Sequence, residues 1–164
     1  MAMDSGLQGS GMMSPAPKCV PASMILRRIS EIRRALVAAP GYLKASSLPL
    51  HPDDLAQHRC LIHSSQPGWV LVGKEPARLR PPAVLSSDSM GFLLQSAILG
   101  AGIALLPAYV CHPALDSGAL VALLPDWVPQ PYEMTMIYPS RENPSRAQLA
   151  FRDHVGRYDF SGFR

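Results

Sequence analysis

The chain has 164 residues, of which 48% are hydrophobic and 16% are charged. It is long enough for about one domain and apolar enough to bury a core, which excludes a chain disordered throughout. The formal net charge of +3 comes from scattered basic residues, apart from the group Arg27, Arg28, Arg33 and Arg34, which we interpret as a solvated strand edge rather than a nucleic-acid-binding face.

The first segment, residues 1–23, is poor in aliphatic side chains and rich in Gly, Ser, Met and Pro. Such a composition does not offset the entropy lost on ordering, so we expect a flexible tail. It contains no basic segment followed by an apolar stretch, which argues against a secretory signal. The three cysteines of the chain lack CxxC spacing, and this favours a reducing, cytoplasmic location.

Short strands and helices are expected to alternate along the rest of the chain. Extended patterns cover residues 25–29 and 34–39, as two strands or as one strand bent near Glu31. A helical turn follows over residues 41–45, and Pro52 begins the next helix. Further strands are expected at residues 59–63, 69–72, 83–85, 103–106, 119–124 and 132–138, and further helices from residue 86, from Pro107 and over residues 144–158.

Residues 90–111 form an uncharged stretch of 22 residues that is long enough for a membrane span. Glycines and a proline interrupt the stretch, and no cationic anchors flank it. Its first part has apolar residues at helical spacing, and residues 103–106 are an entirely apolar run typical of a strand covered on both faces. We therefore expect a helix, a glycine turn and a buried strand, and no membrane partner.

This alternation of elements predicts an α/β fold with a mostly parallel sheet and helices on its faces. In such sheets ligands bind beyond the carboxyl ends of the strands, near the N-termini of helices.

Motifs for catalysis and for cofactors are mostly missing. The chain has no GxSxG, P-loop, HExxH or dinucleotide fingerprint. Two clusters contain residue types that can carry chemistry: a metal site at His58, Cys60 and His63, and a hydrolytic triad drawn from Ser64, Ser65, His63 and Asp88. On a strand His63 would point away from the other two metal candidates, so Cys60 is interpreted as a small buried hydrophobe. We expect no enzyme, no cofactor, and no catalytic or metal-binding residues.

The segment that opens the helix near residue 86 has two interpretations. Hydroxyls and unpaired N–H groups gather there at a helix N-terminus, where an anion is stabilised. Capping of the helix by Ser87 or Asp88 explains the same residues without a ligand, and the negative charge of Asp88 argues against an anion. The candidate ligand-binding residues are Ser86, Ser87, Asp88, Ser89 and Met90.

The order of segments resembles the C-terminal part of the LysR-type transcriptional regulators, their effector (substrate)-binding domain. No single motif is decisive, but many occur in the family's order over about residues 25–155. The matching segments are residues 27–43, residues 51–61, Trp69, residues 94–107 with the ending GIALLP, residues 118–121, residues 124–127, residues 137–141 and the helix through Phe151.

The resemblance implies a periplasmic-binding-protein-like fold, in which a small carboxylate or aromatic acid binds between two lobes. Residues 35–124 would form one nearly complete lobe, and residues 24–34 and 132–158 a remnant of the other, so that residues 24–158 are a truncated effector-binding domain. The crossings would lie near residues 33–37 and 124–131. The family's ligand contacts favour the ligand-site interpretation of Ser86 to Met90.

The family begins with a winged helix-turn-helix, a linker helix and the start of the first lobe, for which this sequence shows no counterpart. We therefore expect an N-terminally truncated regulator with no DNA-binding residues, whose partners are a small-molecule effector and related regulators in homo- or hetero-dimers. The alternatives are a stand-alone interaction module that pairs with full-length regulators, and an inert fragment.

Overall fold

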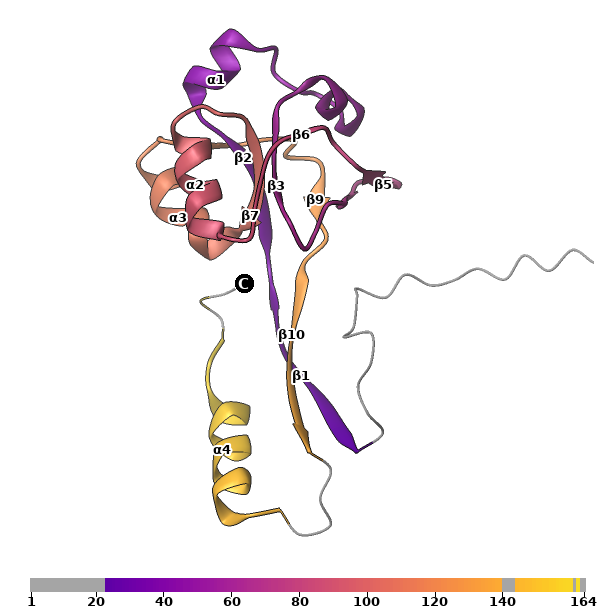
Figure 1. Ribbon diagram of the computed structural model, residues 1–164, viewed down its shortest axis with the longest axis vertical. Helices are drawn as coiled ribbons and strands as arrows, with labels where there is room; N and C mark the ends of the chain where they lie inside the picture. The colour runs from indigo at the N-terminus through magenta and orange to yellow at the C-terminus, as the bar shows by residue number, and fades with distance from the viewer. Residues whose placement is uncertain (1–22, 140–143, 161, 163–164) are drawn as a thin grey trace, which may run out of the picture.

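The computed structural model describes residues 23–139, 144–160 and 162. The tail expected over residues 1–23 lies outside them, apart from Ser23. Figure 1 shows a lobe of sheet and helices at one end of the molecule, and a long two-stranded arm that leads from it to a separate helix.

The lobe is built on a five-stranded sheet with the order β6-β3-β7-β2-β8. Its strands are β2 (Arg34–Ala38), β3 (Cys60–His63), β6 (Ala83–Ser87), β7 (Ile103–Pro107) and β8 (Val121–Ala122). β3 pairs parallel with β6 and β7, whereas β2 pairs antiparallel with β7 and β8. Four strands therefore share one direction and β2 opposes them. The α/β class and the mostly parallel sheet are as predicted, with β2 as the one antiparallel strand of this five-stranded sheet.

The reversed direction of β2 follows from the connection that leaves it. A parallel crossover needs a connection that returns along the whole face of the sheet. Between β2 and β3 the chain forms only α1 (Pro40–Ala45) and the 3-10 helix η1 (Pro52–Gln57). Both stay at one end of the sheet in Figure 1, so the chain turns there and β3 runs back against β2.

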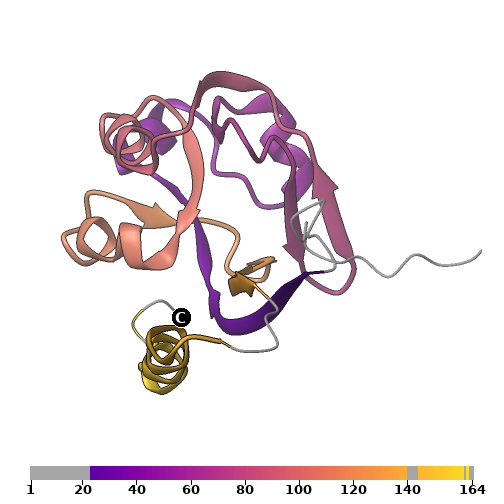
Figure 2. The same cartoon turned by 60° about the horizontal axis from the view of Figure 1, so that its bottom comes forward.

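Two apolar layers cover the faces of this sheet. α2 (Met90–Ile98) and α3 (Ala108–Asp116) lie on one face, where Leu93 and Cys111 pack against Ala104 and Leu106 of β7. The other face packs against a small sheet, β5-β4-β9, formed by β4 (Trp69–Val72), β5 (Pro76–Leu79) and β9 (Val128–Pro129). Figure 2 shows these two layers on opposite sides of the sheet.

The arm consists of β1 (Met24–Ile32) and β10 (Tyr132–Pro139), which pair antiparallel with a bulge between Arg28 and Ser30. Only Arg33 separates β1 from β2, which agrees with the predicted strand bent near Glu31. The chain ends in α4 (Arg146–Arg157), capped by Ser145, whose hydroxyl accepts a bond from Gln148 N–H. Ala147, Phe151 and Val155 lie at helical spacing along α4, yet no residue of the helix is buried.

Several element predictions were confirmed and others need correction. β4 has the predicted bounds, and residues 90–111 form α2, β7 and the start of α3. None of the helices in the described part of the chain has the length and hydropathy of a membrane span. The strand expected at 119–124 shrinks to two residues, and β5 and β9 were not predicted.

A buried polar cluster ties α1 to the segment that enters β3. The Tyr42 hydroxyl accepts a bond from the Arg59 N–H at 3.0 Å and shares a hydrogen bond with His58 Nδ1 at 3.1 Å. The side chain of Tyr42 is buried, and the Arg59 guanidinium stands 5.1 Å from its ring centroid. Removal of the Tyr42 hydroxyl would leave both the Arg59 N–H and His58 Nδ1 without this hydrogen-bond partner.

Tyr42→Phe is therefore expected to lower the free energy of unfolding by about 1–3 kcal/mol, because it leaves two polar groups of the interior without a partner. Urea unfolding followed by circular dichroism measures the change. Tyr138→Phe is the matched control, since the Tyr138 hydroxyl bonds to no described residue. Equal stability of the two variants would contradict this role for Tyr42.

Candidate functional site

The candidate site lies at the edge of the five-stranded sheet where the parallel strands β6, β3 and β7 end. This edge faces the arm in Figure 1. Ser86 and Ser87 are the last two residues of β6, Asp88 and Ser89 connect it to α2, and Met90 is the first helical residue. The five candidate residues thus run from the strand into the helix, whose N-cap lies one or two residues later than the two candidates from the sequence.

Hydrogen bonds inside the segment show which residue caps the helix. The Ser89 hydroxyl accepts the Phe92 N–H at 3.3 Å, so Ser89 is the N-cap rather than Ser87 or Asp88. The Ser87 hydroxyl accepts the Ser89 N–H at 3.1 Å. A hydroxyl that accepts a main-chain bond still has its own proton to donate. Both serines can therefore serve as hydrogen-bond donors to a ligand that carries acceptor oxygens.

His63 and the residue after it hold this segment against the end of β3. The Ser64 N–H donates to the Ser87 carbonyl at 3.0 Å, and His63 Nε2 lies 2.9 Å from the Asp88 carbonyl oxygen. Because a carbonyl only accepts, Nε2 is the donor, and in the neutral ring Nδ1 then accepts the Ser65 hydroxyl at 2.8 Å. The loop is thus tethered by one side chain and one main-chain bond.

The same contacts show that the residues of the hydrolytic triad suggested by the sequence are not hydrogen-bonded as a triad requires. Ser65, His63 and Asp88 do meet, but His63 bonds to the main chain of Asp88 and not to its carboxylate. Ser64 contributes a main-chain N–H rather than its hydroxyl. The arrangement therefore fixes the orientation of the loop and lacks the carboxylate that orients the histidine in a Ser-His-Asp triad.

The metal cluster considered for His58, Cys60 and His63 does not assemble. Cys60 is fully buried, as predicted, and its side chain faces one core layer while His63 lies toward α2 on the other side of β3. Among the described residues no group of three metal-ligating side chains comes together.

Burial also determines the chemistry of the two described thiols. Desolvation raises the pKa of Cys60 to about 12 and that of Cys111 to about 11. Since the thiolate is the reactive form, only about one thiol in a thousand or fewer is ionised at pH 8. We expect iodoacetamide to leave both unmodified in the native chain and to label them in urea. Peptide mass mapping at pH 7 and pH 9 checks this, and labelling of either thiol in the native chain at pH 7 to the extent seen in urea would contradict it.

Arg34, interpreted from the sequence as part of a solvated strand edge, is instead half-buried and hydrogen-bonded at this edge of the sheet. Its Nε donates to the Gln130 carbonyl at 2.6 Å, its Nη1 to the Tyr132 hydroxyl at 2.8 Å, and its guanidinium stacks 4.1 Å from the Tyr132 ring centroid. Burial lowers the pKa of Arg34 and raises that of Tyr132, and the positive charge of Arg34 partly opposes the latter shift. One side chain thus joins the two chain segments that connect lobe and arm.

Comparison with known proteins gives a consistent result. The family model described as "LysR substrate binding domain" matches residues 12–159. An uncharacterized HTH-type transcriptional regulator of Haemophilus influenzae is 31% identical over 125 residues, which cover 74% of this chain and 43% of that protein. The HTH-type transcriptional activator TtdR of Escherichia coli is 33% identical over 113 residues, covering 66% of this chain and 36% of TtdR. The chain thus spans less than half the length of these curated relatives.

Solved structures agree with the sequence matches. The full-length virulence activator AphB of Vibrio cholerae superimposes with a TM-score of 0.74 and 27% identity, covering 84% of this chain and 49% of AphB. The regulatory domain of an AphB variant from Vibrio vulnificus gives a TM-score of 0.76 and 28% identity, covering 83% of this chain and 70% of that domain.

Proposed function

The chain belongs to the LysR substrate-binding domain family, and we propose that it is the effector-sensing part of a LysR-type transcriptional regulator. The relatives it matches are transcriptional regulators rather than enzymes. In the proposed function a small carboxylate or aromatic acid binds at the sheet edge, between two lobes. Residues 35–124 would form one lobe, and residues 24–34 and 132–158 would form part of the other. A regulator acts where the DNA is, so we expect a cytoplasmic location.

The observation that carries this proposal is the donor set at the edge. Ser87 and Ser89 accept main-chain bonds and keep their hydroxyl protons for an acceptor, and both stand at the N-terminus of α2, whose field favours negative charge. His63 and Ser64 hold these donors in place before the ligand arrives. A ligand that binds one arrangement of the lobes more tightly shifts their equilibrium, and this movement is the regulatory signal.

The test is a thermal-shift screen of the chain against small aliphatic and aromatic carboxylates, each paired with its neutral amide. At least one acid should raise the melting temperature, and its amide should not. Ser87→Ala should weaken binding of that acid about 10-fold or more, since a hydrogen bond to a charged group contributes about 1.5–3 kcal/mol.

Ser96→Ala is the matched control on the same helix, since the Ser96 hydroxyl donates to the Phe92 carbonyl away from the edge. Equal loss of binding in both serine variants, or equal shifts by acids and amides, would contradict the proposal. An enzymatic function would instead require turnover that Ser87→Ala abolishes.

The proposed function also implies that this chain does not bind DNA by itself. A gel-shift assay with promoter DNA should give no sequence-specific, salt-sensitive complex. Such a complex would overturn this part of the proposal.

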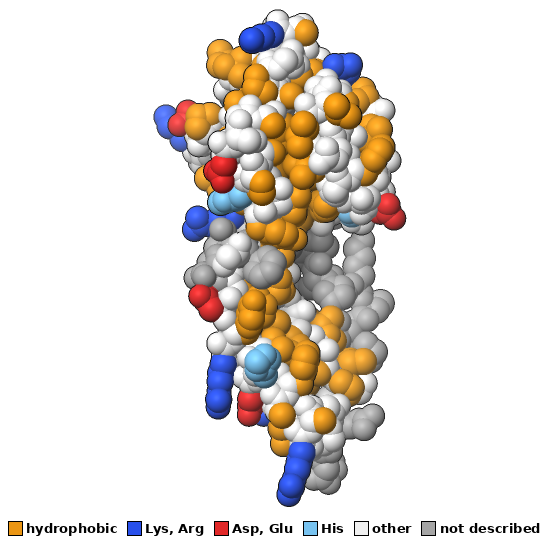
Figure 3. Space-filling view, turned by 90° about the vertical axis from the view of Figure 1, so that its left-hand side faces the viewer, with side chains coloured by type: hydrophobic (Ala, Val, Ile, Leu, Met, Phe, Trp, Pro, Cys, Tyr) orange, Lys and Arg blue, Asp and Glu red, His pale blue; other side chains and the backbone are white. Residues whose placement is uncertain are grey.

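A second candidate function is pairing with a related regulator, and the surface of α4 favours it. Phe151 and Tyr158 are 64% and 57% exposed on one stripe of this helix. Figure 3 shows hydrophobic side chains exposed over α4 and over the helices of the lobe. The chain covers 70% of the Vibrio vulnificus regulatory domain, and the proposed partner is the complementary part of a full-length relative.

Co-purification of the tagged chain with a full-length LysR-type regulator tests this pairing. Phe151→Asp should abolish it, because the new carboxylate would be buried without a partner. Ala150→Asp adds the same charge beside the stripe and should leave the pairing intact. Loss of pairing in both variants, or in neither, would contradict the assignment of this surface.

A further inference from the structure

The small sheet β5-β4-β9 has an exposed apolar row on its outer face, formed by Pro76, Val72 and Val128. The strand register places Val72 directly between the other two residues, and opposite residues of antiparallel strands share one face of a sheet. Val72 is 45% exposed and Val128 64%. Trp69 and Leu71 of β4 point to the other face, where both are buried in the core. The outer face of such a sheet usually carries polar side chains, so the apolar row is available to a partner.

Three basic side chains border the apolar row on the side of β5. Lys74 lies in the turn between β4 and β5, Arg78 stands two residues after Pro76 and shares its face, and Arg80 follows the end of β5. These hairpin cations are exposed, and none of their side chains has an ion pair or hydrogen bond with a described residue. Glu75 is the one acidic residue of the segment 69–80, so the hairpin is positively charged.

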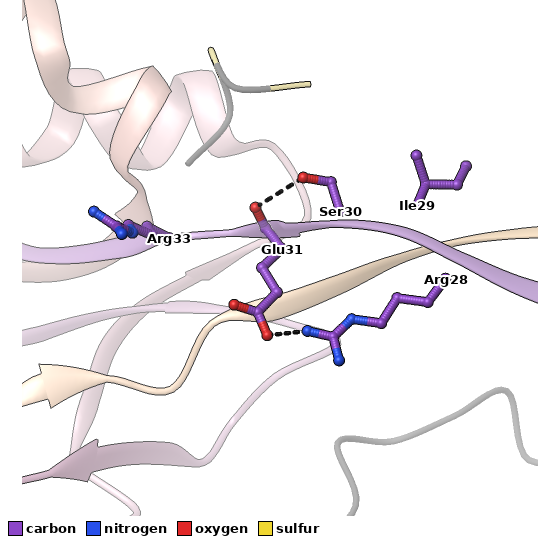
Figure 4. A pocket seen from close by; sticks show the side chains of 5 residues that line it. All are labelled: Arg28, Ile29, Ser30, Glu31 and Arg33. Atoms are coloured by element: carbon purple, nitrogen blue, oxygen red, sulfur yellow. Dashed lines mark hydrogen bonds and ion pairs between the residues drawn. The ribbon is translucent and has the colours of Figure 1, made fainter. Parts of the chain in front are cut away.

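The basic group of the arm differs in its charge partners. At the cavity of about 400 Å³ on β1 (Figure 4), Arg28 donates to the Glu31 carboxylate and lies 3.6 Å from the carboxylate of Glu133. Arg34 is held by the hydrogen bonds described above. The hairpin cations have no such partners among the described residues, so their charge is free to attract an acidic group from outside the chain.

Trp127 fixes the position of the turn that carries Lys74. A Cβ atom at Gly73 would lie 2.9 Å from Trp127 Cε3, so only a glycine leaves room for the ring against this turn. The ring of His51 in turn meets the Trp127 ring edge-on, at 5.1 Å between centroids. A surface that is already fixed loses less conformational entropy when a partner binds.

Two prolines disfavour one mode of binding at this sheet. β5 and β9 are its edge strands, to which a partner strand would add through main-chain hydrogen bonds. Pro76 begins β5 and Pro129 ends β9, and a proline has no N–H group to donate. The two edges have only four and two residues, which leaves few donors for an added strand. A partner therefore gains more by packing its side chains on the face, as an amphipathic helix does.

We propose that the apolar row and the hairpin cations bind an acidic amphipathic helix of another protein. Apolar side chains of that helix pack on the row, and their burial stabilises the complex. Carboxylates along one flank of its apolar stripe pair with the hairpin cations and orient the helix. This surface is separate from the candidate effector site, because the small sheet and α2 cover opposite faces of the five-stranded sheet (Figure 1).

The test measures the fluorescence anisotropy of labelled helical peptides mixed with the intact chain. The peptides share a stripe of leucine and phenylalanine with glutamates along one flank, and they vary in the order of the apolar residues. A second set carries lysine in place of every glutamate. At least one acidic peptide should bind, its lysine counterpart should not, and added salt should weaken the complex.

Two pairs of variants locate the surface. Val128→Asp should weaken binding about 10-fold or more, because the complex would bury a carboxylate without a partner. Leu99→Asp, at an apolar position 84% exposed at the end of α2, should leave binding unchanged. Lys74→Glu should weaken binding a few-fold, as expected for an exposed ion pair, and Lys44→Glu, the same change on α1, should not.

A triple variant separates recognition of charge from loss of folding. With Lys74→Glu, Arg78→Glu and Arg80→Glu combined, the chain should lose the acidic peptide and bind its lysine counterpart, a gain that misfolding does not produce. No binding by any acidic peptide at millimolar concentration, equal binding by the two peptide sets, or equal effects of Val128→Asp and Leu99→Asp would each overturn the inference.

Three other occupants of the face are also outcomes of the test. Tighter binding of phosphatidylglycerol vesicles or of duplex DNA through the same residues would assign the face to a lipid surface or to a nucleic acid. Self-association of the chain that Val128→Asp abolishes would assign it to a second copy. Each of these results would overturn the proposed helix partner.

Discussion

Replacement of Gly102 by alanine is expected to lower the free energy of unfolding by about 3 kcal/mol or more. A Cβ atom at Gly102 would stand 2.3 Å from the Arg59 carbonyl oxygen and 2.9 Å from its carbon. Both atoms belong to the backbone, and the oxygen accepts the Ile103 N–H at 2.8 Å. The new methyl group therefore cannot be relieved by a side-chain rotation and must push the start of β7 away from β3.

The effect is large because β7 separates the two core layers. Ile103 and Leu105 pack into one layer, and Ala104 and Leu106 into the other. A shift of this strand disturbs both layers at once, where protein interiors tolerate little displacement.

Urea unfolding of Gly102→Ala measures the loss. Gly41→Ala in α1 is the control, because nothing lies within 4 Å of its added Cβ atom; it should be neutral or stabilising by up to about 1 kcal/mol, as alanine favours a helix. A Gly102→Ala chain as stable as the parent would refute the close approach of β7 and β3.

The second large effect is expected at Arg34, where Arg34→Met should destabilise the chain by about 2 kcal/mol. Methionine keeps most of the length of the side chain but leaves the Gln130 carbonyl and the Tyr132 hydroxyl without their donor. Loss of the positive charge should also raise the pKa of Tyr132 further, because that charge now opposes the effect of burial.

Two measurements check the role of Arg34. A double-mutant cycle with Tyr132→Phe should give a coupling energy of about 1 kcal/mol, and absorbance titration of the phenolate should show the pKa shift. Arg78→Met, at an exposed position of β5, should change stability by less than about 0.5 kcal/mol. A coupling energy near zero would show that Arg34 does not hold the two segments through Tyr132.

The elements that the sequence predicted well are those whose pattern depends on local burial. β7 is buried on both faces and appears as an uninterrupted apolar run, and α2 repeats its apolar residues at helical spacing. β5 was missed because its four residues begin with proline and lie at the rim of a small sheet, where no alternation is required. The direction of β2 depends on how a connection turns in space, which no local pattern encodes.

In the candidate site, too, features set by the local sequence could be predicted and contacts between distant residues could not. The place of Ser86 to Met90 at the junction of a strand and a helix could be predicted, because it follows from the order of elements. The tether from His63 to Asp88 joins residues 25 positions apart, and Arg34 reaches Gln130 and Tyr132 at 96 and 98 positions. Such contacts depend on the register between distant strands. The helix over residues 144–158 was predicted from its local pattern, but the absence of any buried residue in α4 could not be.

The connection between arm and lobe has a mechanical consequence. β1 continues into β2 through Arg33 alone, and Arg34 ties that strand to the returning segment at Gln130 and Tyr132. A rotation of the arm that turns one of these two segments must therefore turn the other as well or break the hydrogen bonds of Arg34. The strand that Arg34 begins carries Leu36 into one core layer and Val37 into the other, so a movement at Arg34 would reach both layers within three residues.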